Sequence, residues 1–514
     1  MGWLLAVLPL GFLLFFLAFP ILKLLFGTFS LAGFWAVLEN PYYVARLVWT
    51  FQSAGISMLL TLMLGVPVAV MFAKFDFFGK RTLEAVLTLP FVVPTIVVAM
   101  GFNALFGANG LTGINLSGTA FLIILANLFY NFALVVRIVS SYLGTLDTDL
   151  EDAAKVEGAG VWQIFRFITL PIARPAILAS SALVFLYCFA SFGVPLLLGA
   201  GRFNTLEVEV WQSVSNQLKL SEASSLALLQ LLVTFAASFL YTRAQSASRL
   251  SLEVCAKRPF AKGVARVTLI ACVVFTLILT LSPMLALLRQ ALFDKGGLTF
   301  GFFVSALRVG DGLSDVPIGL ALENAVLFVS LTLLLAVPLG LLYALATQFT
   351  GSKMLDALSL LPLMTSATLL GVAFIVAYPK LTANLGLLIA AYTIGAYPFI
   401  VRSVLPALRA LPLEILEAAR VSGATEFQVF WFVTLPLLRP ALSTGIAFAF
   451  ASVIGEFSAT LVLSRPEWAT LTTVIYTKLG RPGQLGDASA VAVLLLGLTT
   501  GGFLLLDRTR GRMG

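Results

Sequence analysis

Long apolar runs constrain this sequence more than any other feature. Twelve of them follow one another along the 514 residues. Each is about 20 residues long, which is enough to cross a hydrocarbon core of roughly 30 Å. Backbone polar groups cannot stay unpaired in lipid, so such runs must be helices. Only 11% of the residues are charged, against about a quarter in a soluble domain. The sequence therefore predicts an all-α membrane protein that crosses a bilayer about twelve times.

The runs divide into two groups of six. They are predicted at 3–26, 52–73, 85–106, 119–142, 176–199 and 223–242, and then at 264–290, 323–346, 357–378, 384–406, 441–463 and 486–506. We expect a first unit over 1–242, a basic linker over 243–263 and a second unit over 264–514. Lys and Arg mark cytoplasmic loops, and they gather after the second and fourth runs, in the linker and in the tail. Twelve spans in a cell membrane, with both termini cytoplasmic, satisfy this pattern.

Composition excludes several kinds of function. The net charge of +8 is explained by cytoplasmic loops and anionic lipid, and no basic–aromatic platform for nucleic acid lies outside the apolar runs. The sequence contains no histidine, so no metal site of the zinc or copper type is expected. It also contains no Gly-x-x-x-x-Gly-Lys-Ser/Thr, so we expect no ATP bound by this chain and no catalytic residues.

The two groups of runs are internal copies. Asp152-Ala153-Ala154-Lys155-Val156-Glu157-Gly158 returns 265 positions later as Glu417-Ala418-Ala419-Arg420-Val421-Ser422-Gly423. Ile168-Thr169-Leu170-Pro171 returns at the same offset as Val433-Thr434-Leu435-Pro436. Six spans per copy give both copies the same orientation, so the sequence predicts two parallel repeats related by an axis along the membrane normal.

Each repeat is expected to project a hairpin into the cytoplasm, near 147–171 and near 412–436. Alanines after an acid favour a helix, and Gly158 and Gly423 are placed to end it. A second short helix is predicted over 161–169 and 426–434, broken from the next span by Leu-Pro. Its aromatic residues invite a partner with a hydrophobic cleft, although spacing alone also allows a helix lying among the headgroups. These aromatic residues are Trp162, Phe165, Phe427 and Phe430.

Both hairpins resemble the cytoplasmic coupling motif of ABC importer permeases, which is Glu-Ala-Ala, three residues, Gly, nine residues and Ile-x-Leu-Pro. The second copy departs only at Val433 and the first only at Asp152. The resemblance implies that the loops dock two copies of an ATP-binding cassette subunit, which carry the ATP, and that a substrate-binding protein delivers the cargo. The residues it implies for ATPase coupling are Asp152, Ala153, Ala154, Gly158, Trp162, Phe165, Glu417, Ala418, Ala419, Gly423, Phe427 and Phe430.

The whole chain resembles the fused permeases of the ferric-iron and thiamine importers. The resemblance lies in Phe189–Gly193, Thr205–Trp211 and Gly455–Thr460. It implies a type I importer fold and a cationic cargo, and we expect ferric iron, with thiamine as the alternative. Two parallel six-span halves also occur in secondary transporters of the major-facilitator type. That alternative is less favoured because the repeat is strongest in the hairpins.

Polar residues within the apolar runs are candidates for a substrate pathway, because they are costly in lipid and usually face the interior. Glu456 is the strongest, since a carboxylate eases the passage of a cation; a structural acid bonded to backbone is the alternative. Its counterpart in the first repeat is Ser191. Tyr187, Asn131 and Ser452 are weaker candidates. We also expect amphipathic helices within 202–221 and 465–484, lying across the outer mouth, where they would dock the substrate-binding protein and take part in outer gating. Interfacial anchors with no contact role are the alternative.

Overall fold

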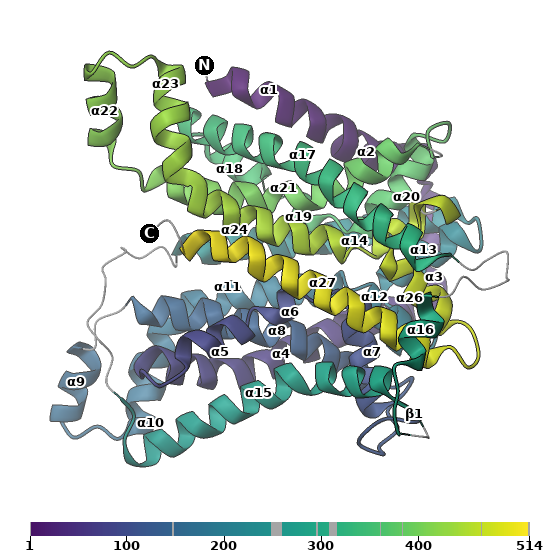
Figure 1. The fold of residues 1–514 in the computed structure, drawn as a ribbon, viewed down its shortest axis with the longest axis horizontal. Helices are drawn as coiled ribbons and strands as arrows, with labels where there is room; N and C mark the ends of the chain where they lie inside the picture. The colour runs from purple at the N-terminus through teal and green to yellow at the C-terminus, as the bar shows by residue number, and fades with distance from the viewer. Residues whose placement is uncertain are drawn as a thin grey trace.

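The structure is a computed structural model that describes residues 2–145, 149–247, 260–294, 297–307, 316–359, 361–382, 384–463 and 465–511. Within these ranges ten helices are long and apolar enough to cross a membrane, or eleven if one sharply bent pair is counted as a span. They form one elongated helical bundle (Figure 1). We call the end that carries α9 and α22 the hairpin end, and the opposite end, at α13 and α26, the distal end.

The part of the chain predicted as the first unit consists of helices joined by short loops, and its last helix runs into the predicted linker. In chain order they are α1 (Gly2–Leu13), the π-helical turn η1 (Leu14–Ala18), α2 (Phe19–Thr28), α3 (Leu31–Glu39), α4 (Pro41–Lys74), α5 (Lys80–Val86), α6 (Leu89–Val92), α7 (Thr95–Phe106), α8 (Ala120–Gly144), α9 (Asp149–Val156), α10 (Val161–Ile164), the π-helical turn η2 (Phe165–Thr169), α11 (Leu170–Phe189), α12 (Gly193–Leu198), α13 (Leu206–Ser215) and α14 (Leu220–Ala247).

The second repeat follows the same order. It has α15 (Gly263–Leu292), the two-residue strands β1 (Phe293–Asp294) and β2 (Gly297–Leu298), α16 (Gly301–Leu307), α17 (Ile318–Thr350), α18 (Lys353–Leu358), α19 (Leu361–Met364), α20 (Ala367–Ala377), α21 (Leu385–Arg409), α22 (Leu413–Val421), α23 (Glu426–Val429), the π-helical turn η3 (Phe430–Thr434), α24 (Leu435–Ile454), α25 (Ser458–Leu463), the 3₁₀ turn η4 (Pro466–Trp468), α26 (Leu471–Leu479) and α27 (Leu485–Gly511).

Two of the twelve predicted spans are broken at matching places. The run at 85–106 forms α5, α6 and α7, and its two parts, Thr82–Val92 and Thr95–Phe106, are bent by 105°. The run at 357–378 forms α18, α19 and α20. Proline removes a backbone donor and disfavours helix at the residue before it. Pro90 and Pro94 lie at the first break and Pro362 at the second, so hydropathy alone could not show that these runs change direction.

The predicted fifth and eleventh spans end earlier than expected. The first ends at Phe189 and the second at Ile454, and a separate short helix, α12 or α25, follows each. The polar residues at the two breaks are Ser191 and Glu456. Thr205 donates its hydroxyl to the Ser191 carbonyl at 2.8 Å, and Thr472 donates to the Glu456 carbonyl at 3.0 Å. Threonines from the following segments thus satisfy backbone groups that the interrupted helices leave open.

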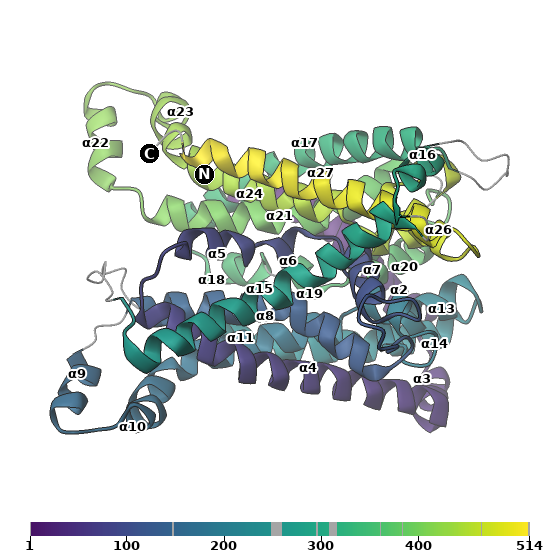
Figure 2. The same ribbon diagram turned by 60° about the horizontal axis from the view of Figure 1, so that its bottom comes forward.

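With the chain divided as predicted, the first helix of each unit packs on the other unit. Helix α1 packs along α17 (Figure 1), and α2 packs against α20. Helix α15 packs against α7 (Figure 2). The second contact is close, because a Cβ added at Gly101 of α7 would lie 2.7 Å from the carbonyl oxygen of Pro283 in α15. On this predicted division, the two units are interlocked.

One prediction tests this close packing. Gly340→Ala should lower the thermal stability of the detergent-extracted protein, because the new Cβ would lie 2.6 Å from the Cβ of Ile400, where α17 meets α21. The matched control is Gly55→Ala, where nothing lies within 4 Å of the added Cβ. Alanine is favoured over glycine within a helix by up to about 1 kcal/mol, so the control should keep or raise the melting temperature. Equal melting temperatures for the two variants would contradict the packing at Gly340.

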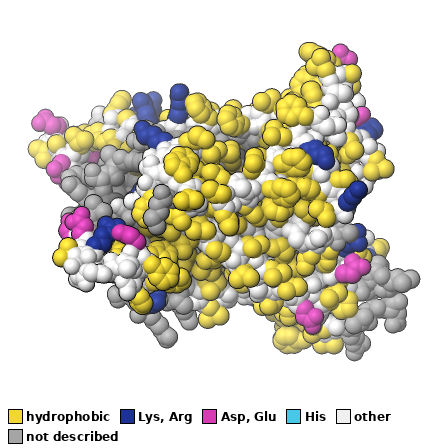
Figure 3. Space-filling model, turned by 90° about the horizontal axis from the view of Figure 1, so that it is seen from above, with side chains coloured by type: hydrophobic (Ala, Val, Ile, Leu, Met, Phe, Trp, Pro, Cys, Tyr) yellow, Lys and Arg dark blue, Asp and Glu magenta, His cyan; other side chains and the backbone are white. Residues whose placement is uncertain are grey.

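The surface matches a protein surrounded by lipid. Hydrophobic side chains cover much of the middle of the face drawn in Figure 3, and charged side chains gather mainly towards the ends. Helix α1 begins and α27 ends at the hairpin end (Figure 1). The linker predicted over 243–263 lies largely outside the described residues, which resume at Phe260.

Candidate functional site: two hairpins and a shared cavity

The hairpins predicted from the repeated motif are present in both repeats. Helices α9 and α22 project from the bundle and are followed by a glycine in the left-handed conformation, with φ of +85° at Gly158 and +88° at Gly423. The residue after each glycine donates its N–H to the carbonyl five positions back, from Ala159 to Ala154 and from Ala424 to Ala419. This is the Schellman ending of a helix, in which a residue at positive φ satisfies the last carbonyls.

The second arm of each hairpin differs from the prediction. It is no separate helix, because α10, η2 and α11 run as one helical segment over Val161–Phe189, and Glu426–Ile454 does the same in the second repeat. A π-helical turn precedes each Leu-Pro, and there Leu170 and Leu435 donate to the carbonyls of Phe165 and Phe430, five residues back. The widened turn takes up the proline that would otherwise break the helix. Each hairpin therefore continues directly into a membrane span.

The exposed residues of the two hairpins match position by position. Trp162 and Phe427 are each 70% exposed, and Phe167 and Phe432 are 73% and 76% exposed. Phe165 and Phe430 are half-buried, with Trp162 packed on Phe165 at a ring-centroid distance of 5.5 Å. Of the remaining predicted coupling residues, Asp152, Ala153, Glu417 and Ala418 are exposed, and Ala154 and Ala419 are half-buried. The structure thus presents two nearly equivalent apolar surfaces at one end of the bundle.

The two hairpins are held in different ways. In the first, Glu151 accepts from Thr169 at 2.6 Å and pairs with Lys74 of α4 at 2.9 Å. In the second, the Arg420 guanidinium bridges the turn to both carboxylate oxygens of Glu426, at 2.8 and 3.2 Å. The position equivalent to Glu151 is Leu416. The same hairpin geometry therefore rests on a contact with the bundle in one repeat and on a contact within the hairpin in the other.

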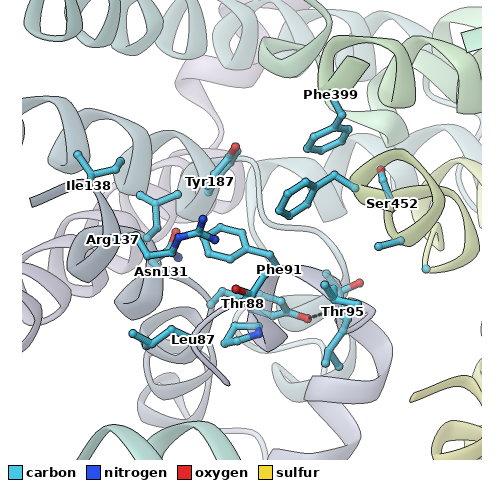
Figure 4. Close-up of a pocket in the computed structure, with 18 of the residues that line it drawn as sticks. Leu87, Thr88, Phe91, Thr95, Asn131, Arg137, Ile138, Tyr187, Phe399 and Ser452 are labelled. Carbon is cyan, nitrogen blue, oxygen red and sulfur yellow. Dashed lines mark hydrogen bonds between the residues drawn. The ribbon is translucent and has the colours of Figure 1, made fainter. Parts of the chain in front are cut away.

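A cavity of about 1550 Å³ lies between the two repeats. Its wall follows α8 from Asn127 to the end of that helix and reaches Thr145, so the cavity extends to the hairpin end. All five pathway candidates line it: Glu456, Ser191, Tyr187, Asn131 and Ser452. Figure 4 shows aromatic rings on opposite sides of this space, with Phe91 and Tyr187 from the first repeat and Phe399 from the second. The transport role of the five pathway candidates stays a prediction, but the structure brings these residues together on one cavity wall.

Some candidates also have structural partners. The Glu456 carboxylate accepts a hydrogen bond from the backbone N–H of Ala459 at 3.0 Å, at the start of α25. This is the kind of contact expected if Glu456 is a structural acid bonded to backbone. The Asn131 side-chain amide donates to the Asn127 carbonyl at 2.8 Å and to the Cys188 sulfur at 3.3 Å. Asn131 therefore links α8 to α11 as well as lining the cavity, as asparagines within membranes often do.

Glu207 also lines the cavity, although it was not among the pathway residues predicted from the sequence. This carboxylate is on α13 and accepts a hydrogen bond from the Gln230 side chain of α14. The helices expected to lie across the outer mouth are α13 and α26, at the distal end of the bundle (Figure 1), and α13 buries both Glu207 and Glu209. An acid in a stretch of alternating apolar residues, Leu206-Glu207-Val208-Glu209-Val210, was the signal available.

Comparison with known proteins decides the class. The sequence matches the family described as "Binding-protein-dependent transport system inner membrane component" over residues 62–288 and again over 318–509. The chain belongs to this family. It is a multi-pass inner membrane permease with two tandem copies of the family domain. This excludes the secondary-transporter alternative.

Individual relatives agree with this assignment. The thiamine transport system permease protein ThiP of Haemophilus influenzae is 24% identical over 90% of this chain and 88% of its own length. ThiP of Escherichia coli is 24% identical over 93% of this chain and 91% of its own. The ferric transport system permease protein FbpB of Actinobacillus pleuropneumoniae is 25% identical over 79% of this chain and 63% of its own. The permease is not itself catalytic, and ATP binds to the ATPase subunits of such importers.

Proposed function

We propose that the cavity is the translocation path for a cation that a substrate-binding protein delivers, and that two copies of an ATP-binding cassette subunit dock on the two hairpins. The observation that carries the proposal is the matched pair of exposed hairpins, each continuous with a span that ends two residues before Ser191 or Glu456 on the cavity wall. Movement of a docked subunit reaches the cavity wall through an unbroken helix. Both termini then lie in the cytoplasm with the hairpins.

An aromatic organic cation of the thiamine kind suits the cavity best. Aromatic rings attract cations over their faces, and the lining includes Phe91, Tyr130, Tyr187 and Phe399 together with the carboxylates Glu207 and Glu456. The thiamine permeases also match this chain over more of its length than FbpB does.

Ferric iron, which the sequence reasoning favoured, is the second candidate. It is supported by the two carboxylates, which are hard oxygen ligands, and by the likeness to FbpB. Among the described residues no group of three His, Cys, Asp or Glu is placed to hold a metal ion. Iron would therefore have to cross without a resting site of that kind.

Reconstituted transport tests the proposal. The permease would be placed in proteoliposomes with its ATPase subunits and its binding protein, and uptake of labelled thiamine and of ferric iron would be measured with and without ATP. We expect ATP-dependent thiamine uptake that needs the binding protein. ATP-dependent uptake of ferric iron alone would reverse the order of the candidates. Uptake of neither, by a complex that still hydrolyses ATP, would reject the proposed cargo.

A further inference from the structure

At the distal end the cavity meets a pair of phenylalanines, one from each repeat. Phe192 and Phe457 occupy equivalent positions, 265 residues apart. Both line the cavity, both are almost fully buried, and their ring centroids lie 6.1 Å apart. Each ring directly follows a break in a helix, after Ser191 in one repeat and after Glu456 in the other. A contact between the two repeats therefore closes the cavity at this point.

A second pair of rings supports the first. Phe192 packs edge-on against Trp211 of α13, with centroids 5.9 Å apart, and Phe457 packs against Tyr476 of α26 at 5.5 Å. Trp211 and Tyr476 are also equivalent in the repeat. We call these four residues the aromatic quartet. The arrangement is pseudo-twofold. Separating the two repeats would divide the quartet into two corresponding pairs, Phe192 with Trp211 and Phe457 with Tyr476.

The quartet is held shut by close contacts on both sides. A Cβ added at Gly193, beside Phe192, would lie 2.7 Å from the Thr95 hydroxyl oxygen of α7. One added at Gly455, two residues before Phe457, would lie 3.0 Å from Cγ of Pro94. Both contacts are at the bend between α6 and α7, with Pro94 and with Thr95, the first residue of α7. The break in that span therefore supplies the surface against which the two ring-bearing segments close.

Two carboxylates lie beside the quartet on the cavity wall. Glu456 immediately precedes Phe457, and Glu207 is four residues before Trp211 on the same helix. They are not equivalent in the repeat, since their counterparts are Ser191 and Thr472. Each repeat thus contributes one acid, from a different element. The negative faces of aromatic rings and two carboxylates together favour a cation and disfavour an anion.

We propose that the aromatic quartet is the distal gate of the path and that Glu207 and Glu456 make this gate selective for cations. The inference rests on the proposed function only in taking the cavity as the path. It requires no particular cargo. When the repeats separate, the ring faces and both carboxylates line the opening, and a cation passes between them into the cavity.

The charge of the two acids can be separated from their structural contacts. Glu456 accepts the Ala459 N–H, and Glu207 accepts from Gln230. Glutamine keeps an acceptor oxygen and nearly the same volume at both places. Glu207→Gln with Glu456→Gln therefore removes charge while it preserves packing, and Glu467→Gln on the exposed turn η4 is the matched control.

Passive leakage tests the gate without reference to the cargo. The complete transporter would be placed in proteoliposomes without ATP, and release of labelled tetraethylammonium and of methanesulfonate would be followed. Phe192→Ala with Phe457→Ala should raise the cation leak about tenfold or more over wild type. Adding the two glutamines should lower the cation-to-anion ratio about tenfold, whereas adding Glu467→Gln should not change it. An unchanged leak from an intact complex overturns the gate, and an unchanged ratio overturns the selectivity.

Cross-linking keeps the test decisive if the alanine variant does not fold. Phe192→Cys with Phe457→Cys would be made in a background in which Cys188, Cys255 and Cys272 are alanine. A short bis-methanethiosulfonate reagent should then abolish ATP-driven uptake, and reduction should restore it. Full uptake by the cross-linked transporter would show that the two repeats need not separate at the quartet. Because tetraethylammonium is no candidate cargo, failure to transport thiamine would leave the leakage result standing.

Discussion

Replacing Gly158 and Gly423 by valine is expected to abolish ATP-driven uptake while the permease still folds. Both glycines have φ near +85°, which a β-branched residue adopts only under strain. Nothing lies within 4 Å of a Cβ added at either position, so the effect is conformational and not a clash. Strain of about 1–3 kcal/mol at each site would shift the hairpins out of the docking conformation. Uptake and ATPase activity in proteoliposomes would be measured alongside the melting temperature.

The matched control for the valine variants is asparagine at the same two positions. Asparagine enters the left-handed region far more readily than valine, so Gly158→Asn with Gly423→Asn should keep most of the uptake. If the valine and asparagine variants transport equally well, positive φ at the hairpins is not required for coupling. If valine lowers the melting temperature by as much as it lowers uptake, the glycines act on folding instead.

Trp162→Ala with Phe427→Ala should weaken the attachment of the ATPase subunits by about 30-fold or more for each hairpin, which is the effect of losing an aromatic anchor worth ~2 kcal/mol. Both rings are 70% exposed in the isolated permease, so little packing within the bundle is lost when they are removed. Co-purification of the ATPase subunits and their equilibrium binding to permease in nanodiscs would measure the change.

The control for the two alanine variants is another exposed aromatic residue, far from the hairpins. Phe26 of α2 is 84% exposed, and Phe26→Ala should leave ATPase binding unchanged. Comparing the single variants adds information, since the two hairpins present matched surfaces. A large effect of Trp162→Ala with none from Phe427→Ala would mean that only one hairpin docks in the way proposed.

The hairpins could be predicted closely because their determinants are local. An acid followed by two alanines favours a helix, and a glycine at the right distance ends it. One feature of the same segment was not predictable from local rules. Pro171 and Pro436 were expected to break the second arm, yet the π-helical turns η2 and η3 keep it continuous. A proline gives the same signal whether the preceding turn breaks or widens.

The pathway was predictable only in part. Buried polar residues in apolar runs gave Glu456, Ser191 and Asn131, which the structure places on one cavity wall. Glu207 was not predicted because the prediction covers only polar residues within the apolar runs, and α13 was expected to lie across the outer mouth. The burial of Glu207 follows from the packing of α13 against α14 and against α20, which belongs to the other repeat. The hydropathy of the sequence does not indicate that α13 contacts α20.

The sequence by itself determined that the chain is a membrane-embedded bundle of helices, that it is built twice, and that each copy carries an exposed hairpin. These properties depend on the length of the apolar runs and on short motifs, and each run or motif lies within about 20 consecutive residues. Only the tertiary structure decided where the spans at 85–106 and 357–378 turn, how the first helix of each repeat packs on the other, and which side chains meet at Phe192 and Phe457. Those features depend on contacts between segments far apart in the sequence, and lipid-facing and protein-facing apolar residues have the same hydropathy.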